Sequence, residues 1–230
     1  MDFAGAFQWM NIQFLLDGLW VTLQVTFYAI IFSLILGGIF GVVRFMGIPI
    51  LSKALGLVID IIRNLPLLLI IFFTYFALPQ LGIRLNIFWA AVGALTIFES
   101  AMISEIIRGG LNAIPKGQAE AGISTGLTRV QTLVYILLPQ AVRSMAPSIV
   151  SQLIALIKDT SLATIISLPE LTHNAKIIYN QNTAYVIPMF VIMTFLYWVV
   201  CYTLSKFSKY LSNRRSNKAI AKDGALKTPA

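Results

Sequence analysis

Charged residues are scarce in this chain. They make up 11% of its 230 residues, whereas a soluble domain carries about 25%. Hydrophobic residues account for 58%, and the mean hydropathy is +0.82. This composition excludes a large soluble domain and indicates a protein that crosses a membrane several times, with about 20 residues in each span.

Residues that often carry chemistry are also scarce. Cys201 is the only cysteine, so we expect it to pack among apolar neighbours rather than form a disulfide. His173 is the only histidine, and no Cys pair or H-E-x-x-H motif could complete a typical zinc site. We expect His173 to be a solvated residue of an outer loop near Glu170. No G-x-x-x-x-G-K-[ST] phosphate loop occurs, so another polypeptide must handle any ATP, and no cofactor, metal or catalytic residue is predicted.

Hydropathy predicts an all-helical fold with five transmembrane helices. The spans fall at roughly 20–43, 57–79, 86–107, 145–168 and 186–206. The first 18 residues contain no Lys or Arg, unlike a secretory signal, so we expect the first span to be retained. These spans place a transmembrane domain at 1–210, with a cytoplasmic loop at 108–143. The polar basic tail at 211–230 is predicted to be disordered and close to anionic lipid.

Positive charges indicate the orientation. Of the 17 Lys and Arg residues, all but Arg84, Lys176 and Lys158 lie between spans one and two or at the edge of the second, between spans three and four, or after span five. The positive-inside rule therefore places the N-terminus outside and the C-terminus inside. The same rule accounts for the net charge of +8, so no nucleic-acid partner is expected.

Two local patterns concern helix packing and helix breaks. The glycines of LILGGIFG, Gly37, Gly38 and Gly41, include a G-x-x-x-G spacing that lets helices approach closely. We favour packing within one subunit over a dimer contact. Pro66 is expected to break or kink the start of the second span.

The loop after the third span begins with a short helix. Pro115 suits its first turn, because the missing N–H would have no intrahelical partner there. Gly126 suits the position just past its end. The sequence therefore predicts a helix over 115–125 that carries Glu120.

A second short helix follows in the same loop. Thr128 and Gln131 form a capping-box pattern, and we expect the helix that they open to end at Pro139. Two short helices at an angle would make a rigid protrusion. Periodicity equally allows an amphipathic hairpin that lies on the lipid surface.

The segment EAGISTGLTRVQTLVYILLP, residues 120–139, resembles the EAA loop of bacterial ABC-importer permeases. One position departs, because the family usually has Ala at Gly122. Two further segments resemble the branch of this family that transports polar amino acids: RGGLNAIPKGQ (108–118) and KDTSLATII (158–166). The resemblance covers most of residues 17–210. The matching positions are Glu120, Ala121, Gly126, Ile136, Leu138 and Pro139.

This resemblance implies a multi-pass permease of the bacterial cell (inner) membrane. It implies a second permease subunit, most simply a homodimer, a pair of ATPase subunits, and an external amino-acid-binding protein. The loop would be a coupling loop that docks on the ATPase. Glu120, Ala121 and Gly122 would belong to the docking surface, and Gly126 would be the hinge between its helices.

Ionisable residues inside the predicted spans are candidates for function. Glu99 falls near the middle of the third span, and Lys158 and Asp159 near the middle of the fourth. A charge at the centre of a lone helix costs about 2.5–3.5 kcal/mol on insertion scales, so it normally faces a cavity or a partner. We therefore predict Glu99 and Asp159 as substrate contacts, because a buried carboxylate can bind an ammonium group. The alternative is a Lys158–Glu99 pair that only links two helices.

Other polar residues complete this prediction. Ser100 and Ser161 lie next to these positions and are predicted as further substrate contacts. Glu105, near the cytoplasmic end of the third span, is expected to pair with Arg108 three residues later.

The predicted function is import of a polar amino acid. The run FESAMISEIIRGGLNAIPKGQ most resembles permeases for glutamine, glutamate or related amino acids. Two acidic residues in the membrane could equally serve a cationic substrate such as arginine. From other classes, we considered an intramembrane hydrolase that uses a Ser with His173, and a membrane scaffold that docks through 115–139.

Overall fold

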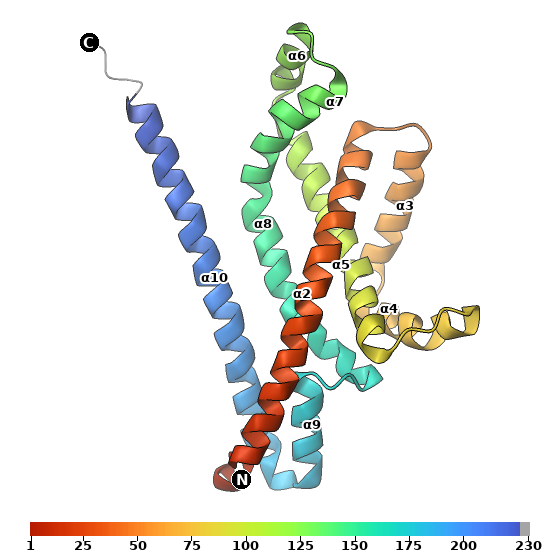
Figure 1. The fold of residues 1–230 in the computed structure, drawn as a ribbon, viewed down its shortest axis with the longest axis vertical. Helices are drawn as coiled ribbons and strands as arrows, with labels where there is room; N and C mark the ends of the chain where they lie inside the picture. The colour runs from red at the N-terminus through yellow and green to blue at the C-terminus, as the bar shows by residue number, and fades with distance from the viewer. Residues whose placement is uncertain (226–230) are drawn as a thin grey trace.

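The fold is an elongated bundle of helices (Figure 1). In this computed structural model the backbone is described for residues 1–225 and the side chains for residues 1–206. No strand occurs within the described residues. The elements are α1 (Phe3–Ala6), α2 (Trp9–Met46), α3 (Leu51–Asn64), α4 (Leu67–Phe72), η1 (Phe73–Ala77), η2 (Leu78–Leu81), α5 (Ile87–Asn112), α6 (Lys116–Ser124), α7 (Arg129–Thr132), η3 (Leu133–Leu137), α8 (Leu138–Asp159), η4 (Thr160–Ile166), α9 (Leu171–Gln181), η5 (Thr183–Tyr185) and α10 (Val186–Ala225).

The helical membrane fold predicted from hydropathy is confirmed. Within the described residues, four helical stretches are long and apolar enough to cross a membrane: Trp9–Met46, Ile87–Asn112, Arg129–Ile166 and Thr183–Lys206. A fifth candidate is the pair Leu51–Asn64 and Leu67–Leu81, which bends by 104° at the break. Pro66 caps the segment after the bend, so the expected break lies where proline removes a backbone donor.

The two ends of the bundle carry different structures. Figure 1 shows α1 and α9 near the N-terminus, while α6, α7 and the far end of α10 lie at the opposite end. The distribution of positive charge predicts that the end with α6 and α7 is cytoplasmic.

The α2–α5 contact depends on glycine. A Cβ atom on Gly37 would lie 2.8 Å from the Ser100 carbonyl oxygen, and one on Gly41 would lie 2.8 Å from the Ser104 carbonyl oxygen. Gly38, on the other side of α2, has no neighbouring atom within 4 Å of such a Cβ. The G-x-x-x-G spacing therefore serves packing within one subunit, as expected.

This difference predicts the outcome of a matched pair of substitutions. Gly41→Ala should destabilise the fold by about 1–3 kcal/mol, because the added methyl group meets α5 backbone that cannot move aside. Gly38→Ala should leave stability unchanged or raise it slightly, since alanine favours helix and the site is open. Thermal unfolding of both variants in detergent measures the difference. Equal unfolding temperatures would contradict the assigned contact.

Two expectations about helix ends are wrong. Pro139 does not end a helix, because α7 continues through the π-turn η3 into α8, with Pro139 in the first turn of α8. A π-turn widens the backbone ladder, and a proline at a helix start needs no N–H partner. The tail expected to be disordered from residue 211 is helical through Ala225, and residues 226–230 lie outside the described part. Lys, Arg and Ala in this tail all favour helix.

An ion-pair network joins three helices near the cytoplasmic end. Glu105 on α5 pairs with Arg108, as expected, and also with Arg44 on α2 at 2.7 Å and Arg63 on α3 at 3.6 Å. Asp60 extends the network, with Arg63 at 3.8 Å and Arg44 at 3.9 Å. The network fixes α3 against the α2–α5 pair.

A buried carboxylate organises the outer end. Glu170, fully buried at the start of α9, accepts hydrogen bonds from the backbone N–H groups of Thr172 (2.9 Å) and His173 (2.7 Å). It also accepts a bond from the Tyr197 hydroxyl of α10 at 3.1 Å. On the α2 side, the Leu171 N–H donates to Thr22 and the Asn174 amide to the Phe14 carbonyl. Helix α9 is thus tied to α2 and α10 together.

Candidate functional site

Glu99 lies in the middle of α5 and is fully buried. Its helix starts at Ile87, after Asn86, whose side chain accepts a bond from the Trp89 N–H, and it runs without a break past Glu99. The Gln152 side-chain amide of α8 donates to Glu99 Oε2 at 3.2 Å. Glu99 Oε1 is buried and has no hydrogen-bond partner among the described residues. A buried oxygen without a donor is costly, so this atom is available to a ligand.

The face that α8 leaves open carries several polar residues beside the exposed Pro147. Ser144, Ser148, Ser151 and Lys158 are exposed, and their spacing of four, three and seven residues places them on one side of the helix. Gln152 and Asp159, both half-buried, border the same side.

Other spans expose apolar side chains instead. The exposed residues of α2 include Phe27, Ile35 and Ile39, and those of α10 include Phe195 and Trp198. Apolar faces suit lipid, whereas a polar face within a membrane span suits water or another polar surface. The open side of α8 is therefore the part of the bundle best suited to line a pathway.

Asp159 stands where α8 ends and the tighter helix η4 begins. It lies on the face of α8 that carries Gln152, the residue that bonds to Glu99, and α8 packs against α5. The short helix α4, after the bend, packs against both α5 and η4. Irregular backbone at membrane depth is tolerated where it is buried in protein or lines a cavity.

The two predicted serines are placed differently. Ser161, half-buried, donates its hydroxyl to the Lys158 carbonyl at 2.6 Å. Ser100 is buried with its backbone carbonyl close to Gly37, and its hydroxyl has no partner within the described residues. Both lie next to the carboxylates in sequence, but neither bonds to them.

The alternative of a Lys158–Glu99 pair is not formed. Among the side chains that the structure describes, Lys158 makes no ion pair and is exposed, while Glu99 is buried against Gln152. Lys158 and Asp159 are consecutive, so they point about 100° apart around α8, and Asp159 takes the direction of α5.

Gln152 is the contact that the sequence prediction missed. It stands seven residues before Asp159, close to two helical turns, so both side chains lie on the same face of α8. A polar residue at this spacing from an intramembrane carboxylate was the available signal.

The protruding loop has the two-helix form that its caps predicted. Helix α6 ends at Ser124, and Gly126 follows with φ +88°. The Gly126 N–H bonds to the Ile123 carbonyl and the Leu127 N–H to the Gly122 carbonyl, which is a Schellman motif. Thr128 and Gln131 form the expected capping box at the start of α7.

The surface of this loop is open. Glu120 and Ala121 are exposed, whereas Gly122 is buried, and a Cβ on it would lie 2.8 Å from Thr132 and from Ile136. Close packing at Gly122 thus holds α6 on the start of the next helix. Four apolar side chains on the protrusion are about half exposed or more: Ile123, Val130, Val134 and Tyr135.

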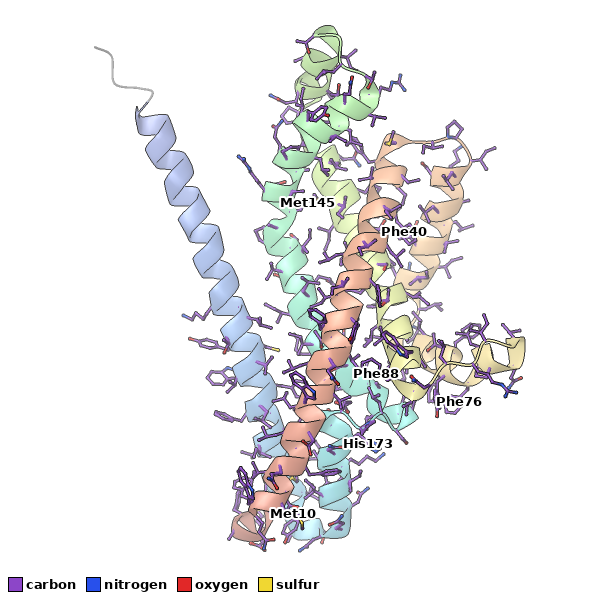
Figure 2. All side chains as sticks on the ribbon, viewed as in Figure 1. Met10, Phe40, Phe76, Phe88, Met145 and His173 are labelled. Carbon is purple, nitrogen blue, oxygen red and sulfur yellow. The ribbon has the colours of Figure 1, made fainter. Side chains whose placement is uncertain are left out.

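His173 is not the solvated loop residue that the sequence suggested. It lies in the first turn of α9 at the outer end (Figure 2), is half-buried, and its Nδ1 atom has no partner within the described residues. Burial, with nearby Lys176, lowers the pKa of His173. No group of three or more His, Cys, Asp or Glu in the described residues could hold a metal ion.

Comparisons with known proteins match nearly the whole chain. The family described as "Binding-protein-dependent transport system inner membrane component" matches residues 29–217. The probable glutamine ABC transporter permease protein GlnP of Bacillus subtilis (strain 168) is 53% identical over 218 residues, 94% of this chain and 100% of that protein. The L-cystine transport system permease protein TcyB of the same organism is 34% identical, over 89% of this chain and 87% of that protein.

A solved structure has the same architecture. The crystal structure of an amino acid ABC transporter with histidines superposes with a TM-score of 0.85 and 29% sequence identity. The match covers 93% of this chain and 99% of that one.

Proposed function

Since the chain belongs to the family of binding-protein-dependent transport system inner membrane components and is the permease subunit of an amino-acid ABC importer, we propose that it forms the pathway for glutamine. The relative that is 53% identical is named as a probable glutamine permease, which favours this substrate over glutamate or a cationic amino acid. ATP is hydrolysed on separate ATPase subunits, because this sequence has no phosphate loop.

The observation that best supports the proposal is the burial and hydrogen bonding of Glu99. A fully buried carboxylate with one oxygen bonded to Gln152 and the other without a donor is suited to an ammonium group. Every free amino acid has an ammonium group, and Asp159 adds a second negative charge nearby. Glu99 and Asp159 therefore bind the substrate ammonium, and Ser100 and Ser161 lie beside them.

Three surfaces of the bundle would bind partner proteins: its two ends and the open face of α8. An external binding protein delivers the amino acid at the end that contains α9. A second permease subunit, most simply another copy, covers the polar face of α8. A pair of ATPase subunits holds the loop that contains Glu120, Ala121 and Gly122, with Gly126 as the hinge between α6 and α7.

Uptake by the assembled transporter tests this proposal. The complex is purified with its ATPase and binding protein, reconstituted in vesicles, and supplied with labelled glutamine. We expect uptake that requires ATP and that unlabelled glutamine suppresses more strongly than glutamate, arginine or cystine. If glutamate, arginine or cystine suppressed uptake more strongly than glutamine does, that amino acid would be the preferred substrate. Uptake that does not require ATP would contradict the proposed coupling to an ATPase.

A further inference from the structure

Glu170 is a buried carboxylate that no cation compensates. It is the N-cap residue of α9, is fully buried, and forms no ion pair with any side chain that the structure describes. Its partners are neutral donors, namely the backbone N–H groups of Thr172 and His173 and the Tyr197 hydroxyl. A buried charge without a counter-charge is costly, so this site favours the uncharged acid.

The hydrogen bonds around Glu170 persist when the carboxylate takes up a proton. The Tyr197 hydroxyl lies 3.1 Å from Glu170 Oε2 and 3.1 Å from the Thr172 hydroxyl. When Glu170 is ionised, Tyr197 donates to it. When Glu170 is neutral, it donates to the Tyr197 oxygen, and Tyr197 donates to Thr172 instead. The same cluster therefore satisfies both forms, and only the ionised form places a charge inside it.

Helix α9 is bounded by irregular backbone on both sides. Residues 167–169 are non-helical and separate it from η4. Asn182, with extended φ and ψ of −148° and 117°, separates it from η5. A helix of 11 residues between two such breaks can lift from α2 and α10 without unfolding the membrane spans beside it.

Few other titratable groups lie at this end of the bundle. Helix α9 packs against α2, α10, η4 and η5, and η4 has no titratable side chain. The titratable side chains that the others and α9 itself carry at this end are Asp17 on α2, Tyr197 on α10, Tyr185 on η5, and His173, Lys176 and Tyr179 on α9. Histidine is the one type among these that ordinarily titrates close to neutral pH, so His173 has to be separated from Glu170 by experiment.

We propose that Glu170 makes the attachment of α9 to α2 and α10 depend on the external pH. A protonated Glu170 adds no charge to the interior, so α9 stays in place. An ionised Glu170 is a charge that water would stabilise, so α9 lifts more readily. External acid therefore holds the outer end closed.

The pH range of this effect follows from the pKa of Glu170. Burial raises this pKa from its ordinary 4.5 to about 7, although the bonds from Thr172, His173 and Tyr197 oppose the rise. When α9 lifts, water reaches the carboxylate and its pKa returns to the ordinary value. Between the two values the closed form binds more protons than the open form. Opening therefore becomes more favourable as the pH rises from 4.5 to about 7, and changes little above that.

Hydrogen–deuterium exchange of the assembled permease–ATPase complex in nanodiscs tests this inference. Exchange of the α9 amides is compared at about pH 5.5 and about pH 7.5, after correction for the intrinsic pH dependence of amide exchange, and we expect the open population to be about tenfold higher at the upper pH. No substrate is present, so the result does not depend on whether glutamine is transported.

Four variants assign the effect to a residue. Glu170→Gln should keep α9 protected equally at both pH values, because the amide resembles the neutral acid and still bonds to its neighbours. Tyr197→Phe removes a donor to the ionised carboxylate, so α9 should loosen at a higher pH than in the native protein. Asp17→Asn, at an exposed carboxylate on the outer end of α2, is the control and should keep the native pH dependence. His173→Gln should also keep it.

Three results would overturn the inference. The first is α9 protection in the native complex that does not change with pH, and this comparison needs no variant to fold. The second is a Glu170→Gln complex that keeps the native pH dependence. The third is loss of that dependence in His173→Gln, which would assign the effect to the histidine.

Discussion

Replacing Glu99 by Gln is expected to reduce amino-acid uptake tenfold or more while the fold stays intact. The change removes the charge but almost no volume, and the new amide oxygen can still accept the bond from Gln152. Membrane insertion should become easier because no charge has to be buried. Asp159→Asn should act in the same direction. Uptake in vesicles, measured beside thermal unfolding in detergent, separates transport from stability.

The same substitution on the same helix supplies the control. Glu105→Gln, six residues along α5, weakens ion pairs with Arg44, Arg63 and Arg108, so it should lower the unfolding temperature. Glu99→Gln should not. If Glu99→Gln were stable and transported normally, Glu99 would have no role in the substrate site, and if it were unstable, its role would be structural. Basal ATP hydrolysis should change less than uptake, because the coupling loop is untouched.

Reversing the charge at Glu120 is expected to uncouple the permease from its ATPase. Glu120 is exposed on α6, in the protruding loop with its apolar patch, and it makes no ion pair within the described residues. Reversing the charge of this side chain should therefore leave the permease fold unchanged. An unpaired or like charge in a docked interface costs several kcal/mol, and each 1.4 kcal/mol is about tenfold in affinity. Glu120→Lys should thus weaken ATPase association by tenfold or more and reduce uptake with it.

Pull-down of the ATPase from detergent and uptake in vesicles measure these effects together. Lys176→Glu, an equal charge reversal at the outer end, is the control and should associate normally. Glu120→Gln should fall between the native protein and the lysine variant. Normal association and uptake by Glu120→Lys would show that Glu120 lies outside the docking surface.

The features of this structure that depend on neighbouring residues could be predicted from the sequence. The capping box of Thr128 and Gln131, the glycine end at Gly126 and the break at Pro66 depend on neighbouring residues, so residue type alone predicts them. Pro139 was misjudged because the π-turn before it has no comparable signature. The absence of a Lys158–Glu99 pair depends on how α8 is rotated against α5. That rotation is set by packing between helices far apart in the sequence, as at Gly37 and Gly41, and no local pattern reports it.

The bonds around Glu170 limit how the outer end can open. Separating α9 from α10 would break the Tyr197 bond and leave a buried carboxylate short of a donor. Separating α9 from α2 would leave the Leu171 N–H and the Asn174 amide without their acceptors. The outer halves of α2, α9 and α10 therefore move as one block. Ser167, with its left-handed φ of +62°, begins the link that joins this block to η4. Movement of α9 relative to η4 would be taken up by the non-helical link at 167–169.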